Sequence, residues 1–329
     1  MDIHSINRHI TGSKKDASKK FEEDVLNGLL SSPKKLYPKY FYDEEGTALF
    51  RKIMDTPEYY LTGCELDIFK NKTAELAKCI TPDVAPFDLI ELGAGDGFKS
   101  KHLLHYLSRA NAEFTYMPID ISNSILGFLR NSLQTELPRL QVQGFEGEYM
   151  EMLTEACASS NRRKVILFLG ANIGNMEVDE SINFCRQLRT LLSPGDLVLI
   201  GFDLKKNPKT VLSAYNDKSG VTSMFNLNLL KRINRELLAN FVLDQYEHYP
   251  MYDPVSGSCR SFLVSLRSQH VNIGKQTIQF EKDEVIAMEI SQKYNLNEIR
   301  SLAKNTGFET VGMVMDSQEW FVDAIWKIK

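Results

Sequence analysis

The sequence lacks the features that mark several large classes of protein. Its 329 residues include only five cysteines, widely spaced and without a CxxC pair, so we expect no disulfide framework and no metal site. No apolar run approaches the roughly 20 residues that a membrane helix needs. The start of the chain, Met1 to His4, does not show the basic and then apolar pattern of a secretion signal. We therefore expect a soluble, cytoplasmic protein with reduced thiols.

Positive charge is not in excess either. Lysine and arginine number 39 and aspartate and glutamate 43, which leaves a formal net charge of -4. That balance offers no electrostatic basis for binding nucleic acid, which usually asks for a basic domain. The lysines at 14–15 and 19–20 are diluted by acidic neighbours, so we expect a solvated helix face there. The expected partner is a small molecule, and we expect a monomer.

The middle of the chain shows short apolar runs that alternate with helical patterns. The predicted strands are 87–92, 114–121, 140–144, 164–169 and 197–202. The predicted helices are 100–110, 122–137, 150–158 and 179–192. This alternation predicts a doubly wound parallel sheet, with strands covered on both faces. A helix at 297–305 and strands at 308–315 and 320–328 suggest an antiparallel hairpin that closes the sheet.

The remaining segments have another texture. Residues 1–80 predict helices, including one at 65–80, joined by tyrosine-rich loops. Residues 204–289 contain helical patterns at 208–217 and 226–241 and strand-like runs at 260–267 and 270–280. We therefore expect a core at 81–203 and 290–329 and a smaller, substrate-binding lobe at 204–289. The tyrosine-rich loops of 1–80 are expected to contribute to the substrate site.

A glycine-rich turn, ELGAGDG at residues 91–97, directly follows the first predicted strand. Glycines such as Gly93 and Gly95 let the backbone turn sharply and approach a ligand closely. NAD-binding proteins share such turns, but the strand here ends in an acid, Glu91. S-adenosylmethionine carries an amino group and a positive charge and no pyrophosphate, so an acid favours this methyl donor. The alternatives are NAD and a structural turn without a ligand.

Three further positions are candidates for binding the donor. Asp120 ends the second strand and can accept both ribose hydroxyls, although NAD enzymes also use that position. Lys99 follows the turn and can contact the donor's carboxylate or hydroxyls, or else face solvent. Glu148 and Tyr149 follow the third strand, where this fold places groups that hold the adenine, and a surface turn is the alternative. Together these features predict a Rossmann-like, class I methyltransferase with S-adenosylmethionine as cofactor.

Several short strings, in order along the chain, resemble one family of such enzymes. The sequence is similar to the histidine-specific Nα-methyltransferases of ergothioneine biosynthesis and to relatives that methylate tryptophan-derived amines in fungi. The resemblance runs from about Pro38 to the end. The strings include Tyr42-Asp43 with GTALF at 46–50, PEYY at 57–60, FLG and IGN at 168–170 and 173–175, AYND at 214–217, GVT at 220–222, and EIS with KY at 289–294.

The resemblance implies a site residue by residue. The donor would be bound by Gly93, Lys99, Asp120, Glu148 and Tyr149, although the family often has aspartate where this chain has Glu148. The amino-acid substrate would be bound by Tyr59, Asn175, Tyr215, Glu289 and Ser291. Tyr42 would lie close to the reacting amine, and Asn175 and Tyr215 would bind the α-amino and carboxylate ends. Glu289 would accept a hydrogen bond from an imidazole N–H, and Ser291 would serve the other ring nitrogen.

The residues themselves support part of this assignment. Asn175 follows the fourth strand, at the edge where open α/β sheets bind ligands. Tyr42, Tyr59 and Tyr60 lie in loops where they can form a lid, with packing as the alternative. Glu289 sits among apolar residues, so its carboxylate needs a partner, either a ligand or a nearby Lys or Arg.

One departure concerns the substrate. Histidine-specific members carry a methionine in the strand after Tyr252-Asp253, and the matching position here is Ser261. Histidine, methylated to the trimethylated betaine hercynine, is the expected substrate, with another amino acid or an aromatic amine as the alternative. An NAD-dependent oxidoreductase and a non-catalytic binding protein are more distant alternatives. None of the six histidines, which include His4 and His9, lies in an arrangement typical of an oxidoreductase.

Overall fold

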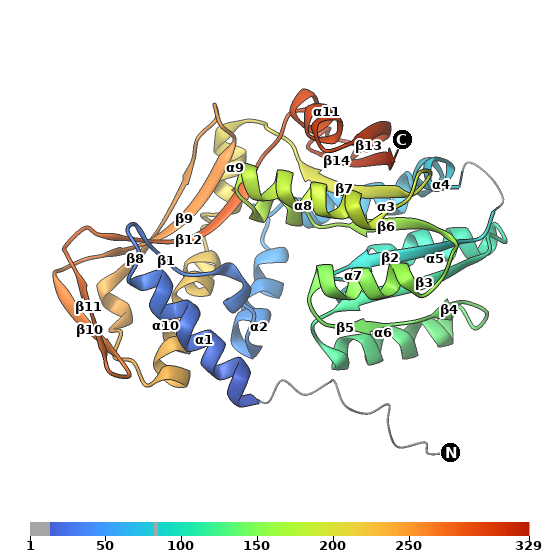
Figure 1. Cartoon of the computed structure of the whole chain (residues 1–329). Helices are drawn as coiled ribbons and strands as arrows, with labels where there is room; N and C mark the ends of the chain where they lie inside the picture. Colours follow the sequence, from blue (N-terminus) through green and yellow to red (C-terminus); the bar gives the residue numbers. More distant parts are fainter. Residues whose placement is uncertain (1–13, 82–84, 329) are drawn as a thin grey trace, which may run out of the picture. The chain divides into compact units, whose positions relative to one another are not determined.

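The computed structural model describes residues 14–81 and 85–328 of the chain (Figure 1). The features noted at Met1, His4 and His9 lie outside these ranges. The contacts divide the chain into two compact units. The first unit combines residues up to Glu58 with Leu212–Tyr252 and Cys259–Glu289, and the second combines Tyr59–Val211, Asp253–Ser258 and Ile290–Lys329.

The second unit is built on one large sheet. Its strands are β2 (Phe87–Leu92), β3 (Phe114–Asp120), β4 (Gln141–Val142), β5 (Phe145–Glu146), β6 (Arg163–Phe168), β7 (Leu197–Asp203), β13 (Phe308–Met315) and β14 (Phe321–Ile328). The order is β13-β14-β7-β6-β2-β3-β4, with β5 also paired to β3. Strand β14 runs antiparallel to both of its neighbours, and the pairs among β2 to β7 are parallel. The predicted doubly wound sheet with its closing hairpin is confirmed.

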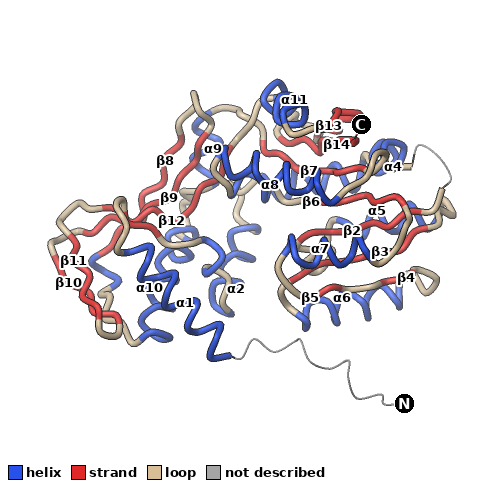
Figure 2. The backbone as a smooth tube through the Cα atoms, in the orientation of Figure 1, coloured by secondary structure: helices blue, strands red, loops and turns tan. Residues whose placement is uncertain are grey.

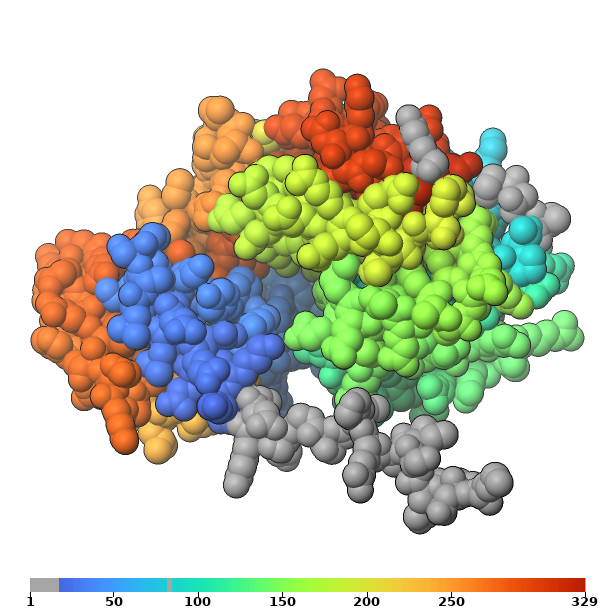
Figure 3. Space-filling view, viewed as in Figure 1, coloured from blue at the N-terminus to red at the C-terminus, as the bar shows by residue number. Residues whose placement is uncertain are grey.

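Helices cover both faces of this sheet. They are α3 (Leu61–Asn71), α4 (Thr73–Ile80), α5 (Ser100–Arg109), α6 (Asn123–Glu136), α7 (Tyr149–Ala158), α8 (Val178–Leu191) and α11 (Leu296–Asn305). Helices α7, α8 and α11 share one apolar core with the strands, and in the space-filling view the segments of α7 and α8 hide the strands behind them (Figure 3). Helices α3, α4 and α5 pack on one another, and α3 also packs on β14. The strands β2, β3 and β7 are buried along their whole length, as their apolar runs predict.

The first unit combines helices with a smaller sheet. Its helices are α1 (Lys14–Leu29), α2 (Glu44–Met54) and α10 (Val221–Leu237), and α9 (Pro208–Ala214) crosses the boundary between the units. Its sheet has the order β1-β12-β9-β8, formed by β1 (Lys34–Lys35), β8 (Tyr246–Tyr252), β9 (Ser258–Ser265) and β12 (Val285–Gln292). The boundary between the units falls within β12, so its last residues, from Ile290 on, belong to the second unit. A hairpin of β10 (Gln269–Ile273) and β11 (Gln276–Phe280) completes the unit, as the tube view shows (Figure 2). Strand β9 alternates buried and half-buried residues, which is typical of a sheet with one covered face.

The structure corrects several predicted elements. The predicted helix at 65–80 is two helices, because the backbone at Lys72 leaves the helical region with φ -122° and ψ 18°. The predicted strand at 270–280 is the β10–β11 hairpin, which turns at Gly274 with φ +56°. The predicted strand at 140–144 contains only the short strand β4, and a second short strand, β5, follows it and also pairs with β3.

Other elements were missed or lie in a different unit. Strand β8 contains Glu247, His248 and Pro250, and β12 contains Glu289 and Ser291, so neither forms a continuous apolar run. Helices α3 and α4, which the sequence analysis grouped with the N-terminal segment, belong to the second unit. Within the described ranges, no helix is long and apolar enough to cross a membrane.

Candidate active site

The glycine-rich turn lies at the carboxyl end of β2, at the edge of the sheet where ligands of this fold bind. Gly93, Gly95 and Gly97 have φ values of +69°, +55° and +68°, a region that residues with a Cβ rarely adopt. A Cβ at Gly93 would lie 2.5 Å from Oη of Tyr149. The turn therefore requires glycine at Gly93 for two reasons, the backbone angle and the close approach of a ring.

Asp120 holds the turn in place from the neighbouring strand. One carboxylate oxygen accepts a hydrogen bond from the backbone N–H of Gly95 at 3.1 Å, and the other accepts one from the N–H of Ser122 at 3.0 Å. The side chain is 9% exposed. The structure thus brings Asp120 and the turn together, as the sequence analysis expected.

Glu91 points into the interior beneath the turn. It is 4% exposed and accepts a hydrogen bond from the hydroxyl of Tyr116 on β3. Burial raises the pKa of Glu91 to about 7, while the hydrogen bond from Tyr116 opposes that rise. A large fraction of Glu91 is therefore neutral at pH 7, which weakens the argument that this acid attracts a positive charge.

Lys99 directly precedes helix α5 and is engaged with a residue that sequence reasoning missed. Its ammonium forms an ion pair with Glu65 of α3, and its side chain is 23% exposed. Glu65 also accepts hydrogen bonds from the backbone N–H of Gly170, at 2.8 and 3.0 Å to its two oxygens. A signal for Glu65 existed, since it shares the apolar face of its helix with Leu61 and Ile68.

Glu148 and Tyr149 begin helix α7, next to the turn. Glu148 is exposed, and its side chain makes no capping hydrogen bond. Tyr149 packs edge-on against Phe168, with ring centroids 6.1 Å apart, and burial raises its pKa to about 12. The phenol is therefore neutral at ordinary pH and covers Gly93. The donor-site residues expected from the sequence all belong to the second unit.

Two expected substrate residues approach one another within the second unit. Asn175 ends the short 3-10 helix η2 (Asn172–Asn175), which follows β6. The preceding residue, Gly174, lies so close to β12 that a Cβ there would be 2.8 Å from the carbonyl oxygen of Gln292. Ser291 is the neighbour of Gln292 on that strand. The backbone therefore brings the Asn175 and Ser291 positions to the same edge of the sheet.

A buried polar cluster supports Ser291. Lys293 is 0% exposed, donates a hydrogen bond to Ser291 Oγ at 2.8 Å and pairs with Asp203 at 2.7 Å. Asp203 ends β7 and also accepts a hydrogen bond from the hydroxyl of Tyr60 at 2.8 Å. Tyr59, an expected substrate residue, is the chain neighbour of Tyr60. The sequence analysis missed Asp203 and Lys293.

The other expected substrate residues belong to the first unit. Tyr42 is 46% exposed and packs edge-on against Phe50 and Phe225, with centroid distances of 5.5 and 5.7 Å. Tyr215 is 7% exposed. Glu289 is half-buried on β12 and, being two residues from Ser291, projects from the same face of the strand.

Ser261, the position of the missing methionine, contacts a histidine. It is 2% exposed on β9, and its hydroxyl lies 3.2 Å from Nε2 of His248 on β8. Burial lowers the pKa of His248 to about 4. The pair is therefore neutral and polar where the family has a thioether.

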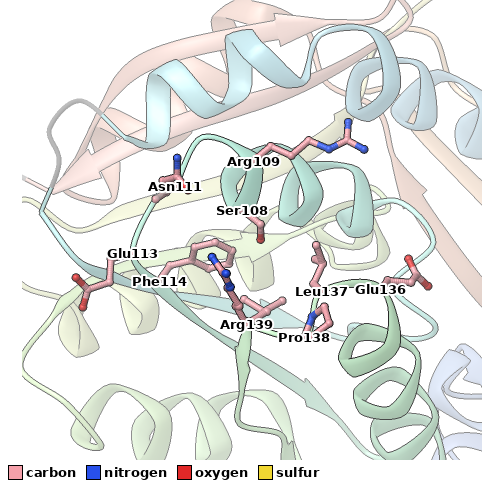
Figure 4. Close-up of a pocket in the computed structure, with 11 residues that line it drawn as sticks. Ser108, Arg109, Asn111, Glu113, Phe114, Glu136, Leu137, Pro138 and Arg139 are labelled. Carbon is pink, nitrogen blue, oxygen red and sulfur yellow. The ribbon is translucent and has the colours of Figure 1, made fainter.

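A separate hollow lies at the opposite edge of the large sheet. Its volume is about 530 Å³, and its lining includes Ser108, Phe114 and Arg139, from the end of α5, the start of β3 and the loop after α6 (Figure 4). Ligands of open α/β sheets bind outside the carboxyl ends of the strands, and this hollow lies at their amino ends. The geometry therefore favours the edge that carries the glycine turn.

The arrangement at that edge defines a class. A parallel sheet closed by antiparallel β14, a glycine turn after β2 and an acid at the end of β3 form the framework of a class I methyltransferase. These residues fit an adenosine-containing donor, because there is open space where a Cβ on Gly95 would be and Asp120 presents carboxylate oxygens beside that glycine.

Comparison with known proteins identifies the family. The chain belongs to the histidine-specific, S-adenosylmethionine-dependent methyltransferases, whose family model matches residues 21–328. It is 34% identical to a histidine N-alpha-methyltransferase of Mycobacterium tuberculosis over 82% of this chain and 83% of that one. It is 30% identical to ergothioneine biosynthesis protein 1 of Schizosaccharomyces pombe, over 82% of this chain and 36% of that longer protein. It is 27% identical to a 4-dimethylallyltryptophan N-methyltransferase of Claviceps fusiformis, over 87% of this chain and 86% of that one.

Among solved structures, similarity is more distant. An S-adenosylmethionine-dependent methyltransferase from Clostridium acetobutylicum aligns over 86% of this chain and 98% of that one, with a TM-score of 0.43 and 13% identity. The family match and the curated relatives show that the chain is an S-adenosylmethionine-dependent N-methyltransferase.

Proposed function

We propose that the chain transfers methyl groups from S-adenosylmethionine to the α-amino group of a free amino acid, with L-histidine as the substrate and hercynine as the product. The observation that carries this proposal is the pair Glu289 and Ser291 on one face of β12. A carboxylate accepts a hydrogen bond from one nitrogen of an imidazole, and a hydroxyl can serve the other. The names of the relatives in Mycobacterium and Schizosaccharomyces support the same substrate and a role in ergothioneine biosynthesis.

The donor is proposed to lie against the glycine turn. Gly93 and Gly95 would approach it with their backbone, Asp120 would accept the ribose hydroxyls, and Lys99 would contact the carboxylate. Glu148 and Tyr149 would hold the adenine, with the ring of Tyr149 already packed over Gly93. The role of Glu91 would be indirect, because its carboxyl group lies beneath the turn and bonds to Tyr116.

The substrate roles follow the family pattern. Asn175 and Tyr215 would bind the α-amino and carboxylate ends, Tyr59 would contact the amino acid, and Tyr42 would lie near the reacting nitrogen. The domain assignment predicted from the sequence, with a donor-binding core and a substrate-binding lobe, agrees with this division of roles and stays a prediction. The cytoplasmic location and the monomeric state are predictions of the same kind.

Methyl transfer to an amine is an in-line displacement that requires a neutral nitrogen. The donor supplies an electrophilic methyl group on a sulfonium when it is bound. The α-amino group of a peptide has a pKa near 8 and that of a free amino acid about one unit higher, so its deprotonation costs roughly 2–3 kcal/mol at neutral pH. A strong general base is therefore unnecessary, and Tyr42 or a water can relay the proton from the nitrogen to solvent.

Positioning supplies the remaining acceleration. Holding the nitrogen in line with the S–CH₃ bond is worth about 7–11 kcal/mol at best. Asn175 and Tyr215 would orient the amine through polar contacts. Three successive transfers require the nitrogen to rotate between rounds, so such contacts must be loose enough to exchange.

A second candidate substrate is an aromatic amine derived from tryptophan. The observation in its favour is Ser261, which replaces the methionine of histidine-specific members and contacts His248. The relative from Claviceps fusiformis, which is named as a 4-dimethylallyltryptophan N-methyltransferase, supports the same candidate substrate.

The test combines binding with product analysis. Titration calorimetry with S-adenosylmethionine, followed by mass spectrometry on a panel of amino acids and aromatic amines, should show donor binding and trimethylation of histidine. No donor binding at millimolar concentration would exclude a methyltransferase. Binding without methylation of any amine would favour the non-catalytic binding protein, and turnover with NAD would favour the oxidoreductase.

Substitution of Glu289 distinguishes between the two candidate substrates. In Glu289→Ala, kcat/KM for histidine should fall about 10- to 100-fold, since a hydrogen bond to a charged group is worth about 1.5–3 kcal/mol. An indole substrate should be unaffected or improved. Glu247→Ala, at an exposed position of β8, is the matched control. If the wild-type enzyme methylates an aromatic amine and not histidine, then Ser261, and not Glu289, indicates the substrate.

A further inference from the structure

Two buried acids, Glu65 and Asp323, lie in a cluster with Lys99 beside the donor site, and neither acid has a role in the function proposed above. Glu65 is 1% exposed, and its carboxylate is shared between the ammonium of Lys99 and the backbone N–H of Gly170. Lys99 follows the glycine turn after β2, and Gly170 follows β6. One side chain of helix α3 therefore connects the loops after two neighbouring strands of the sheet.

Lys99 is held close to this second loop. Its Nζ lies 3.6 Å from the place where a Cβ on Gly170 would be, and Gly170 has φ +78°. A lysine ammonium has three hydrogens to donate. Glu65 accepts a hydrogen bond from one of these N–H groups. The other N–H groups of Lys99 are thereby held in a fixed position next to the turn.

A second carboxyl group lies next to Glu65. Asp323, in the middle of β14, is directly opposite Gly201 of β7 and is 0% exposed. A Cβ at Gly201 would overlap Glu65 Oε1, so Glu65 lies over this glycine. Residues directly opposite each other in an antiparallel pair project to the same face, so Asp323 and Glu65 are neighbours.

Asp323 is uncharged in this buried position. Neither of its carboxyl oxygens has a hydrogen-bond partner among the residues that the structure describes. Burial raises the pKa of Asp323 well above its usual range, and the neighbouring Glu65 carboxylate raises it further, while Lys99 opposes the rise. A buried ionised carboxylate without partners is strongly disfavoured, so Asp323 holds its proton. The cluster then contains one negative charge, on Glu65, and one positive charge, on Lys99.

We propose that Glu65 is a positioning residue that holds the Lys99 ammonium in place for the carboxylate of the methyl donor. Asp323 is a neutral acid in this arrangement, so Lys99 is the counterion of the Glu65 carboxylate alone. The inference rests on the proposed donor role of Lys99 and adds the residues that set its position. Fixing the ammonium before binding removes the entropy loss that a mobile lysine would otherwise impose on the donor.

The amino-acid end of the donor provides the test. S-adenosylhomocysteine carries the carboxylate that Lys99 would contact, and 5′-methylthioadenosine has the same nucleoside and lacks the amino-acid end. Titration calorimetry of both ligands would use the full chain and the variants Glu65→Gln, Lys99→Met, the double variant and Asp323→Asn. Glu75→Gln, at an exposed position of α4, is the control for the same chemical change.

The expected pattern is selective. In Glu65→Gln and Lys99→Met, the Kd of S-adenosylhomocysteine should rise at least about tenfold, and that of 5′-methylthioadenosine should change less than about twofold. The double variant should bind no more weakly than Lys99→Met, because Glu65 acts through the lysine. Asp323→Asn and Glu75→Gln should bind both ligands as the wild type does.

Other patterns would overturn the proposal. Equal weakening of both ligands in Glu65→Gln, accompanied by a lower unfolding temperature, would assign Glu65 a structural role only. Wild-type binding of S-adenosylhomocysteine by Glu65→Gln would remove any role, and a tenfold loss in Asp323→Asn would contradict the neutral acid. If the wild type bound neither ligand, the proposed function itself would fail, a result distinct from all of these.

Discussion

Replacement of the glycines by alanine tests whether the turn is shaped by backbone angle, by close packing or by both. Gly95 has φ +55° and open space around its Cα, whereas Gly93 has φ +69° and a Cβ there would meet Tyr149 Oη at 2.5 Å. Gly127, inside helix α6, has neither constraint. The three positions therefore form a graded series in one unit of the protein.

The expected free energies follow from these differences. Gly127→Ala should stabilise the protein by about 0.5–1 kcal/mol, because alanine is the better helix former. Gly95→Ala should cost about 1–2 kcal/mol for the left-handed backbone. Gly93→Ala should cost the same plus about 0.5–1.5 kcal/mol for forcing the Tyr149 ring out of its rotamer. Because that ring is also proposed to hold the donor, the donor Kd should rise about tenfold more in Gly93→Ala than in Gly95→Ala.

Urea denaturation and titration calorimetry would measure the two effects. The decisive variant is the double change Gly93→Ala with Tyr149→Phe, which removes Oη and leaves the nearest ring carbon 3.3 Å from the new methyl group. Stability and donor affinity should then return to the level of Gly95→Ala. The reasoning is refuted if Gly93→Ala is no more harmful than Gly95→Ala, or if Tyr149→Phe restores nothing.

Two further predictions concern pH. Burial raises the pKa of Glu91 from 4.5 to about 7, so the folded state binds this proton more tightly than the unfolded state does. The contribution of Glu91 to the free energy of unfolding should therefore fall by up to about 3 kcal/mol as the pH rises from about 4.5 to 7. Denaturation across that range should show this slope in the wild type and lack it in Glu91→Gln; equal slopes would contradict the assignment. Burial acts to raise the pKa of Asp217, but hydrogen bonds from Ser219, Thr222 and Val221 outweigh it and lower the pKa to about 2. Asp217→Asn should therefore cost about 1–3 kcal/mol at pH 7, and the difference from the wild type should vanish as the pH falls from about 4 to 2; a difference that persists at pH 2 would contradict this account.

The parallel sheet was predictable because its strands are buried on both faces. Strand β2 was predicted with its observed bounds, since every residue from Phe87 to Leu92 is buried and the glycine turn marks its end. Strands β8 and β12 were missed for the opposite reason. Burial alternates along β8 and along β12 as far as Ile290, and Pro250 or Glu289 interrupts the run of apolar residues.

The candidate site was predictable only where a residue lies next to a recognisable turn. Asp120 and Lys99 are of this kind. Glu65 and Asp323 come from a helix and a strand remote in the sequence, and the packing of α3 on β14 together with the pairing between β14 and β7 brings them together. A single sequence does not contain that pairing, although a carboxylate within the apolar run of β14 was a sign that some partner or function must compensate for its burial.

Strand β12 also limits how the recognition of a substrate can change. Glu289 and Ser291 are two residues apart on an extended backbone, a separation of roughly 6.6 Å at about 3.3 Å per residue. Insertion or deletion of one residue between them would turn one side chain to the opposite face. Variation of the preferred substrate is therefore expected to proceed by exchange of side chains at constant spacing, as at Ser261 on the neighbouring strand β9, while changes in chain length are confined to the loops.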